Sequence, residues 1–432
     1  MATSIYFLSV ALVGYLSSRL TEKYKSHFAH IIPLGLGITG LFYFWDILIW
    51  NKFNLAGFII FVLFFALLTV LFLRIKKIRI ITPIEFNLLD LIILGLLLLV
   101  ALQQIYGYWD AWAIWNTKAK FLTSENWQQL FSPQIKWMHP DYPLLLPSIV
   151  AAGWSVSNTF NPVVPFVVAL LFSWSIYLLV KDWISHLFNN SVYGVLGGLL
   201  MISLPAFLRW SGSQYADIPL ANFILLGVTL LYFSTKNLSV FISGSAFGMA
   251  IFTKNEGLLY FVLILASFIY TFWRINKKIP FKSVMLLLGG ALPGILSSLV
   301  VKNYATRNEF ITNFPNIISS ISFHRIFLIL EGFLREFLAW KEWIVFWIIA
   351  IIFLVFLHKR EKEHYFWNTF FTVLIVLCFV SFFFIYLVTP QDVVWHIQTS
   401  FNRLLIQIFP LVIVSIFIRL RHLKIKQAFP EI

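Results

Sequence analysis

Long apolar segments recur along this chain, and they constrain its fold more than any other feature. Most of them are about 17–24 residues long, the length that an α-helix needs to cross the hydrocarbon core of a bilayer. In that core every backbone N–H and C=O must find its partner within the protein, which a helix achieves inside one segment. The sequence therefore predicts an all-α polytopic bundle of about 13 transmembrane spans.

The composition agrees with a membrane protein and excludes an ordinary soluble domain. The chain has 432 residues, of which 60% are hydrophobic and 12% are charged, whereas a soluble domain carries about 25% charged residues. The one cysteine, Cys378, lies inside an apolar run, so there is no disulfide framework and no cysteine-based metal site. The predicted spans are residues 4–19, 29–49, 55–73, 86–106, 162–180, 190–208, 217–235, 238–253, 257–273, 283–301, 343–358, 365–388 and 404–420.

The basic residues predict how the chain is oriented in the membrane. Twenty of the 32 Lys and Arg lie in short loops between alternate spans or just after the last span, and the positive-inside rule places such loops in the cytoplasm. The N-terminus is then outside and the C-terminus inside. The residues of this basic set are Arg19, Lys23, Lys25, Arg74, Lys76, Lys77, Arg79, Lys181, Lys236, Arg274, Lys277, Lys278, Lys282, Lys359, Arg360, Lys362, Arg419, Arg421, Lys424 and Lys426.

The net charge of +14 has the same explanation. Its basic residues cluster beside hydrophobic ends, as expected for membrane topology and anionic lipid headgroups, and no nucleic-acid-binding motif is present. The first segment has no charged leader and no small-residue cleavage site, so we expect a retained span. We expect one membrane domain over residues 1–432, with additional N-terminal spans in residues 1–84, in a prokaryotic plasma membrane.

The interval 107–147 is the longest polar stretch in the first half of the chain. It contains five tryptophans, with Asp110 and Asp141 near its two ends. We expect this loop to form the floor of an active site outside the cytoplasm, with Asp110 performing the chemistry. Residues 144–157 then stay on the outer side as an interfacial or re-entrant helix, because they are too short to span comfortably. Residues 324–337 are predicted as an amphipathic helix on the same surface.

A short helix in the membrane interface is predicted inside this loop. One helical face presents Trp112, Trp115, Ala119 and Leu122. Indole rings are well accommodated at the interface, while charged side chains on the other faces can reach water. The polar residues off this face are Lys118, Lys120 and Ser124.

Further ionisable residues fall in turns on the same predicted side. Charges beside the hydrocarbon are costly unless they are paired or hydrated, so they mark functional cavities more often than chance. Each of them singly is as readily an ordinary interfacial charge. Carboxylates could accept a proton from a hydroxyl, while Lys and Arg could hold a phosphate. These residues are Asp217, Lys254, Glu256, Asp392, His396 and Arg403.

Three other residues receive a structural interpretation. His139 precedes Asp141 and Tyr142, but no His, Asp or Glu spacing resembles a metal-ligand set, so a His–Asp hydrogen bond is favoured over a metal. Asp90 is interpreted as a helix-pair or interfacial residue. Asp46 is a weaker candidate for a cavity.

Five short motifs resemble the GT-C superfamily of integral-membrane glycosyltransferases, which includes protein O-mannosyltransferases and the lipid A aminoarabinose transferase. In order they are YWDAWAIWNTKAK, HPDYPLLLP, YADIPLA, TKNEG and WHIQTSFNRLL. The resemblance implies transfer of a sugar from a polyprenyl-phosphate donor to a lipid, glycan or protein acceptor at the outer membrane face. No cofactor is implied, and the loop lacks the paired acids that would suggest a bridging metal.

The resemblance also implies roles for particular residues. Asp110 is the base or acceptor-orienting acid, and Asp217 is the second acid. Lys254 and Arg403 hold the donor phosphate. Around them, the expected substrate-binding set is completed by Glu256, His139, Asp141, Tyr142 and His396.

Two other classes of function remain open on sequence alone. A secondary transporter or lipid flippase places its charges near the middle of the bilayer and often has inverted repeats. No repeat is visible here, and the charges collect toward one side. A non-catalytic assembly subunit would leave Asp110 without a pocket.

Overall fold

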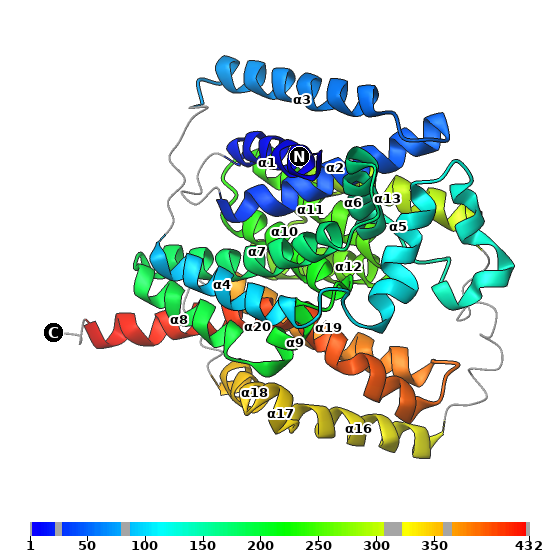
Figure 1. Ribbon diagram of the computed structural model, residues 1–432. Helices are drawn as coiled ribbons and strands as arrows, with labels where there is room; N and C mark the ends of the chain where they lie inside the picture. Colours follow the sequence, from blue (N-terminus) through cyan, green and yellow to red (C-terminus); the bar gives the residue numbers. More distant parts are fainter. Residues whose placement is uncertain (1, 22–27, 79–86, 306–321, 357–364, 429–432) are drawn as a thin grey trace. The chain divides into compact units, whose positions relative to one another are not determined.

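The computed structural model describes residues 2–21, 28–78, 87–305, 322–356 and 365–428. Within these ranges every regular element is helical (Figure 1). In chain order they are α1 (Ala2–Arg19), α2 (Phe28–Trp50), α3 (Leu55–Ile75), α4 (Leu88–Leu102), η1 (Ala111–Trp115), α5 (Asn116–Leu122), η2 (Trp127–Phe131), η3 (Pro133–Met138), α6 (Leu145–Ser157), α7 (Val163–Phe188), α8 (Ser191–Ile202), α9 (Pro205–Ser211), α10 (Asp217–Tyr232), α11 (Asn237–Thr253), α12 (Glu256–Asn276), α13 (Phe281–Tyr304), α16 (Phe323–Phe337), α17 (Trp340–Trp343), α18 (Phe346–Phe356), α19 (Tyr365–Leu387) and α20 (Val393–Ala428).

Seven of the described helices are long and apolar enough to cross a membrane, namely α2, α3, α7, α12, α13, α19 and α20. Helices α8 and α9 make an eighth span if they are counted as one, although the chain bends by 77° between them. Other apolar helices, including α4, α6, α10 and α11, have 10–17 residues. The predicted all-helical class is confirmed for the described residues, and several of the thirteen predicted runs form helices shorter than a full span.

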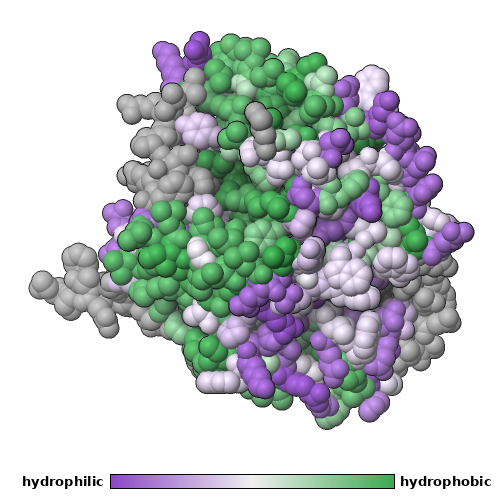
Figure 2. All heavy atoms as spheres, viewed as in Figure 1, coloured by the Kyte–Doolittle hydropathy of each residue, from purple (hydrophilic) through white to green (hydrophobic). Residues whose placement is uncertain are grey.

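The chain divides into two compact units, and the first comprises Met1–Leu179, Arg209–Leu258 and Lys282–Thr306. In this unit α1 lies along α2, and α10 lies along α11. Gly14 and Gly35 let α1 and α2 approach closely, because a side chain at either position would overlap backbone of the other helix. Helix α3 packs on α1 and α2 and exposes apolar side chains along its length, as Figure 2 shows. Such a surface suits contact with lipid.

Helix α6 corresponds to the predicted short helix over residues 144–157. It packs against α1, α2, α5 and α11, and its residues from Leu145 to Trp154 are buried. Other helices of the protein therefore cover it. The interfacial and re-entrant alternatives both stay predictions.

Helices α11 and α13 of the first unit touch through their backbones. A side-chain carbon at Gly244 or Gly248 would overlap backbone of α13, and one at Gly290 or Gly294 would overlap backbone of α11. On each helix the two glycines are four residues apart, so they lie on one face. Small residues at this spacing permit close helix packing in membranes. This contact fixes the direction in which α13 leads toward Lys302.

The second unit comprises Val180–Leu208, Leu259–Phe281 and Arg307–Ile432. Helix α20 is its central element and packs against α8, α16, α18 and α19. Phe333 of α16 stacks on Phe401 of α20 with ring centroids 4.0 Å apart. The predicted amphipathic helix over residues 324–337 is confirmed as α16, where Ile329 is buried and Phe327 is exposed.

Part of the predicted basic set lies outside the described residues, as does much of the interval that follows α13. These basic residues are Lys23, Lys25, Arg79, Lys359, Arg360 and Lys362.

Candidate functional site

Four separate segments of the first unit bring polar side chains together at one end of its helices. They are the 107–142 loop, the start of α10, the turn between α11 and α12, and the end of α13. Hydrogen bonds join the loop to the α11–α12 turn and to α13, and a hydrogen bond joins the loop to the residues before α10. The common side that the sequence predicted for these segments is confirmed within this unit.

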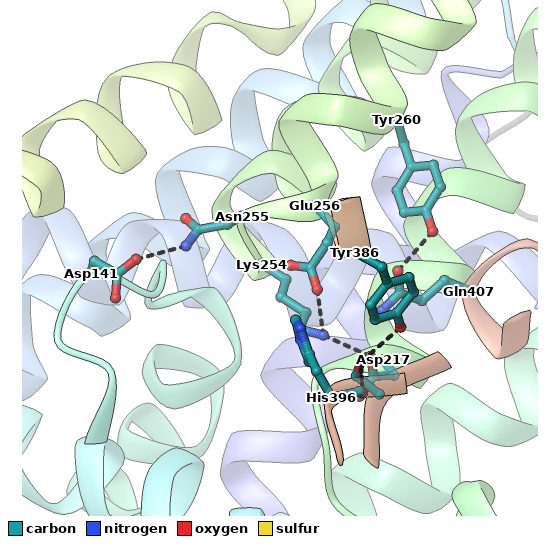
Figure 3. A network of polar contacts seen from close by, with 10 residues as sticks. Asp141, Asp217, Lys254, Asn255, Glu256, Tyr260, Tyr386, His396 and Gln407 are labelled. Carbon is teal, nitrogen blue, oxygen red and sulfur yellow. Dashed lines mark hydrogen bonds and ion pairs between the residues drawn. The ribbon is translucent and has the colours of Figure 1, made fainter. Parts of the chain in front are cut away.

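Lys254 is the centre of the first polar group. It follows α11 in an extended conformation, and its Nζ lies 2.9 Å from Asp217 Oδ1 and 2.7 Å from Glu256 Oε1 (Figure 3). Asp217 is completely buried, while Glu256 is partly exposed. Two carboxylates and one ammonium group formally carry one net negative charge. The expected meeting of these three residues is therefore observed, but Lys254 is already neutralised by protein groups.

Asp141 is the centre of the second polar group. Its Oδ2 accepts a hydrogen bond from Asn255 Nδ2 at 3.0 Å, and the two side chains point toward each other in Figure 3. Lys302, at the end of α13, donates to Asn255 Oδ1 at 2.7 Å and to the Asp141 carbonyl oxygen at 3.2 Å. Because Asn255 lies between Lys254 and Glu256 in the chain, this group adjoins the first one.

Lys118 departs most clearly from the sequence-based expectation. It was expected to reach water from the polar side of an interfacial helix, but its side chain is 0% exposed. Its Nζ donates to the backbone carbonyls of His139, at 2.6 Å, and Tyr142, at 3.4 Å. Burial lowers the pKa of Lys118 to about 7, partly offset by the nearby Asp141 carboxylate. The reason for the error is tertiary, because α5 is covered by α6 and by the 139–142 turn.

Aromatic rings surround this turn. Tyr142 stacks on His139 with centroids 4.7 Å apart and on Trp115 with centroids 5.7 Å apart. The predicted helical face runs over η1 and α5. Its residues Trp115, Ala119 and Leu122 are buried, whereas Trp112 is exposed. The hydrogen bond expected between His139 and an aspartate stays a prediction.

Asp110 begins the π-helical turn η1 and is half-buried. Its backbone N–H donates to the Tyr215 hydroxyl at 3.0 Å. Just before it, Gly107 adopts a φ of +71° where the chain passes close to Ser213, and the Tyr108 N–H bonds to the Ser213 carbonyl at 3.2 Å. The loop is thereby attached to the residues that precede Asp217.

A small pocket lies beside this attachment. Its polar wall is formed by Asn116, Gln214 and Tyr215, and apolar side chains of α6, α7 and α10 complete it. Asn116 Nδ2 donates to Gln214 Oε1 at 2.9 Å, which holds two of these groups in place.

The second unit contains the other two predicted site residues on α20. His396 Nδ1 is 2.8 Å from Thr389 Oγ1, and its ring lies edge-on to Tyr386. Arg403 follows His396 by seven residues, so both lie on one face of the helix, and Arg403 is half-buried. Its contact with a donor phosphate stays a prediction.

Two acids have structural roles. Asp90 belongs to the capping box of α4 and accepts a hydrogen bond from the Tyr177 hydroxyl of α7 at 3.2 Å, so the predicted helix-pair contact is confirmed. Asp46 accepts from the Asn54 N–H at 2.9 Å and holds the connection between α2 and α3.

Sequence reasoning missed three members of the site. Asn255 stood inside the motif TKNEG, but amides were not considered beside the charges. Lys302 stood at the end of an apolar run at the start of a long polar interval. Lys118 had no sequence signal, because its burial depends on segments that follow it by 20 residues or more.

Among the described residues, no three His, Cys, Asp or Glu side chains group in a way that could hold a metal ion. Comparison of the chain with family models, curated proteins and solved structures gave no match.

Proposed function

We propose that this protein is a membrane glycosyltransferase of the GT-C type. It moves a sugar from a polyprenyl-phosphate donor to a lipid, glycan or protein acceptor at the outer face of the membrane. In this proposal the thirteen apolar runs form the membrane domain, with the N-terminus outside and the C-terminus in the cytoplasm. The resemblance of the five motifs supports the donor class.

One structural observation carries the proposal. Carboxylates, lysines and an amide from four distant segments gather at one end of apolar helices, beside a loop rich in aromatic rings. Charges at such a position are costly, which favours a functional role for the whole set. The flat faces of the aromatic side chains suit contact with sugar rings, and the carboxylates suit contact with hydroxyl groups.

Asp110 is the proposed general base. It takes the proton of the acceptor hydroxyl while the hydroxyl oxygen forms a bond to the anomeric carbon of the sugar. The bond from that carbon to the phosphate oxygen breaks, and polyprenyl phosphate leaves with the electron pair. A phosphate is already a good leaving group, so positioning and charge stabilisation are the main tasks of the protein. Tyr215, which accepts a hydrogen bond from the Asp110 backbone, also lines the small pocket between α6, α7 and α10.

Lys302 is the proposed contact for the donor phosphate in the first unit. Lys254 was implied by the resemblance, but its buried ammonium already faces the carboxylates of Asp217 and Glu256. Lys302 is exposed, and it donates hydrogen bonds to neutral oxygens of Asn255 and Asp141. The Asp141 and Glu256 carboxylates also favour its charged form, and an anion can reach its exposed ammonium. Asp217, which is fully buried against Lys254, acts as a positioning residue.

The first test is deletion in the native host, followed by mass analysis of surface glycans and accumulated lipid-phosphate sugars. Reintroduced wild type should restore the missing glycan, and Asp110→Asn should not, although the protein is present at normal levels. The matched control is Glu125→Gln, because Glu125 is an exposed carboxylate of the same loop, 3.8 Å from Lys52. Restoration by Asp110→Asn at the wild-type rate would exclude Asp110 as the base.

A further inference from the structure

The strongest unexplained feature of the first unit is the buried ammonium of Lys118. Two backbone carbonyls accept its hydrogen bonds, from His139 and Tyr142, and its Nζ lies 5.5 Å from the centre of the Tyr142 ring. A lysine side chain usually keeps its charge in water, so complete burial needs a specific reason. The carbonyls it contacts belong to one tight turn that carries Asp141.

The turn is short, and its backbone and side chains are connected to several segments. The Tyr142 N–H donates to the His139 carbonyl at 2.9 Å, the same oxygen that accepts from Lys118. His139 has a φ of +50°, which is uncommon for a residue other than glycine. The side chain of Asp141 then reaches Asn255, and its carbonyl reaches Lys302. Lys118 is therefore connected through one turn to the residues that adjoin Lys254.

We propose that Lys118 is a positioning residue that holds the 139–142 turn, and with it Asp141, against the α11–α12 turn, and that protonation of Lys118 opens this turn. In the open state the side chain of Lys118 leaves its buried position and is hydrated. The effect on sugar transfer rests on the proposed function, whereas the opening itself can be measured without a substrate.

The direction of the pH effect follows from the two states. In the closed state burial lowers the pKa of Lys118 to about 7, whereas the open state has the ordinary lysine value of about 10.5. Between these values the closed state binds fewer protons than the open one. A rise in pH from 7 therefore stabilises the closed turn. Below about pH 7 Lys118 is protonated in both states, and the closed turn is then least stable relative to the open one.

The charged and titratable neighbours of Lys118 come from few segments. Asp141 and Lys302 are the charged groups that act on it, with opposite effects on its charge. His139 and Tyr142 are the other titratable residues of the turn. The elements that pack on α5, namely η1, η2 and α6, contain no ionisable residue. No buried carboxylate from those elements stabilises the ammonium.

Hydrogen exchange of the peptide spanning residues 138–145, corrected for the intrinsic rate at each pH, tests the proposal on the purified full chain. In the wild type we expect protection of this peptide to be about tenfold higher at pH 8 than at pH 6, from the two pKa values. Lys118→Met removes the charge and both hydrogen bonds to the turn, so its protection should fall below that of wild type at pH 8 and should not change with pH. Lys118→Arg stays charged and should give low protection across the range.

The matched control is Lys120→Met, because Lys120 is an exposed lysine of the same helix and its loss should leave the wild-type pH dependence unchanged. If Lys118→Arg does not fold, the pH dependence of exchange in wild type and in Lys118→Met still tests the proposal. Equal protection of the wild-type peptide at pH 6 and pH 8 would overturn the proposal. An unaltered pH dependence in Lys118→Met would overturn it as well. Neither outcome depends on whether the protein transfers a sugar.

The effect of Lys118 on sugar transfer is measured separately, from the pH profile of the reaction. If the proposed function holds, the acid limb of the pH profile of sugar transfer should be lost in Lys118→Met, while the Lys120→Met profile matches the wild type. A lysine that only fills space would change the rate without moving the profile. Absence of any transfer activity in the wild type would contradict the proposed function and leave the exchange result to stand alone.

Discussion

Three lysines of the first unit show how burial and partners decide what a side chain can do. Lys254 is buried between two carboxylates, Lys118 is buried against two backbone carbonyls, and Lys302 is exposed beside neutral oxygens. Only the last combination leaves a positive charge that an external anion can reach. The three residues carry the same formal charge in the sequence, so their different roles come from their surroundings.

At the residue scale, we predict that Lys302→Gln weakens binding of an anionic isoprenoid. A hydrogen bond to a charged group contributes about 1.5–3 kcal/mol, so loss of the charge should raise the Kd of a short-chain isoprenyl phosphate by about tenfold or more. Lys302→Arg should retain most of the affinity. Titration of the purified protein in detergent measures both variants.

The uncharged isoprenyl alcohol serves as the control ligand, and its affinity should be the same for wild type and Lys302→Gln. Lys120→Gln is the control variant on the loop, because Lys120 is exposed and lies over Phe160, 5.5 Å from the ring centre. If Lys302→Gln binds the phosphate as tightly as wild type, Lys302 is not the contact.

At the scale of elements, the position of Lys302 depends on how α13 packs. The helix runs beside α11 through paired glycines, and it ends at Tyr304, two residues beyond Lys302. Helix α11 in turn ends just before Lys254. The close contact between these two helices therefore sets the distance between the Lys254 group and the Asp141 group. Residue spacing within one helix does not determine this distance.

Two adjacent glycines of α13 provide a test of this packing. At Gly290 a side-chain carbon would overlap the carbonyl oxygen of Phe241, which is backbone and cannot move aside alone. At Gly289 the nearest atoms are ring carbons of Phe241, 3.7 and 4.0 Å away. We predict that Gly290→Ala destabilises the protein by roughly 1–3 kcal/mol or more, and that Gly289→Ala is neutral or slightly stabilising.

The melting temperatures of Gly290→Ala and Gly289→Ala are measured in detergent, from the fraction of each protein that stays monodisperse on heating. The hydrogen bond between Lys302 and Asn255 predicts a second effect, since Gly290→Ala should also weaken isoprenyl phosphate binding and Gly289→Ala should not. Equal melting temperatures for the two variants would show that α11 and α13 do not depend on this close approach.

At the scale of the whole molecule, the long apolar helices indicate a membrane protein, and the distribution of basic residues predicts its orientation. The 107–147 loop and the α12–α13 connection are then on opposite sides of the membrane. Glu125 and Lys278 are exposed representatives of these two segments. The orientation can be tested without knowledge of the substrate.

We predict that Glu125→Cys reacts with a membrane-impermeant maleimide on intact cells, and that Lys278→Cys reacts only after the membrane is permeabilised. Both variants are made in a Cys378→Ser background, which removes the one native cysteine. The Cys378→Ser protein itself is the unlabelled control. Labelling of Lys278→Cys on intact cells, with Glu125→Cys protected, would reverse the proposed orientation and place the polar site in the cytoplasm.

The sequence by itself determined the class of fold and the segments that form the site. Long apolar runs have to be helical in a membrane because their backbone groups find no other partners there. The same argument places charges in the turns, which is why the residues around Asp110, Asp141, Asp217 and Lys254 could be predicted to share one side. The burial of Trp115, Ala119 and Leu122 and the amphipathic α16 also followed from spacing alone.

Only the tertiary structure decided what each polar residue contacts. The depth of Lys118 depends on α6 and on a turn 21 residues away, and the pairing of Asp141 with Asn255 joins positions 114 residues apart. Sequence spacing gives the direction of a side chain on its own helix but not the atoms that cover it. Burial and pairing set the charge that remains available, and for Lys118, Lys254 and Lys302 they come from the packing of distant segments.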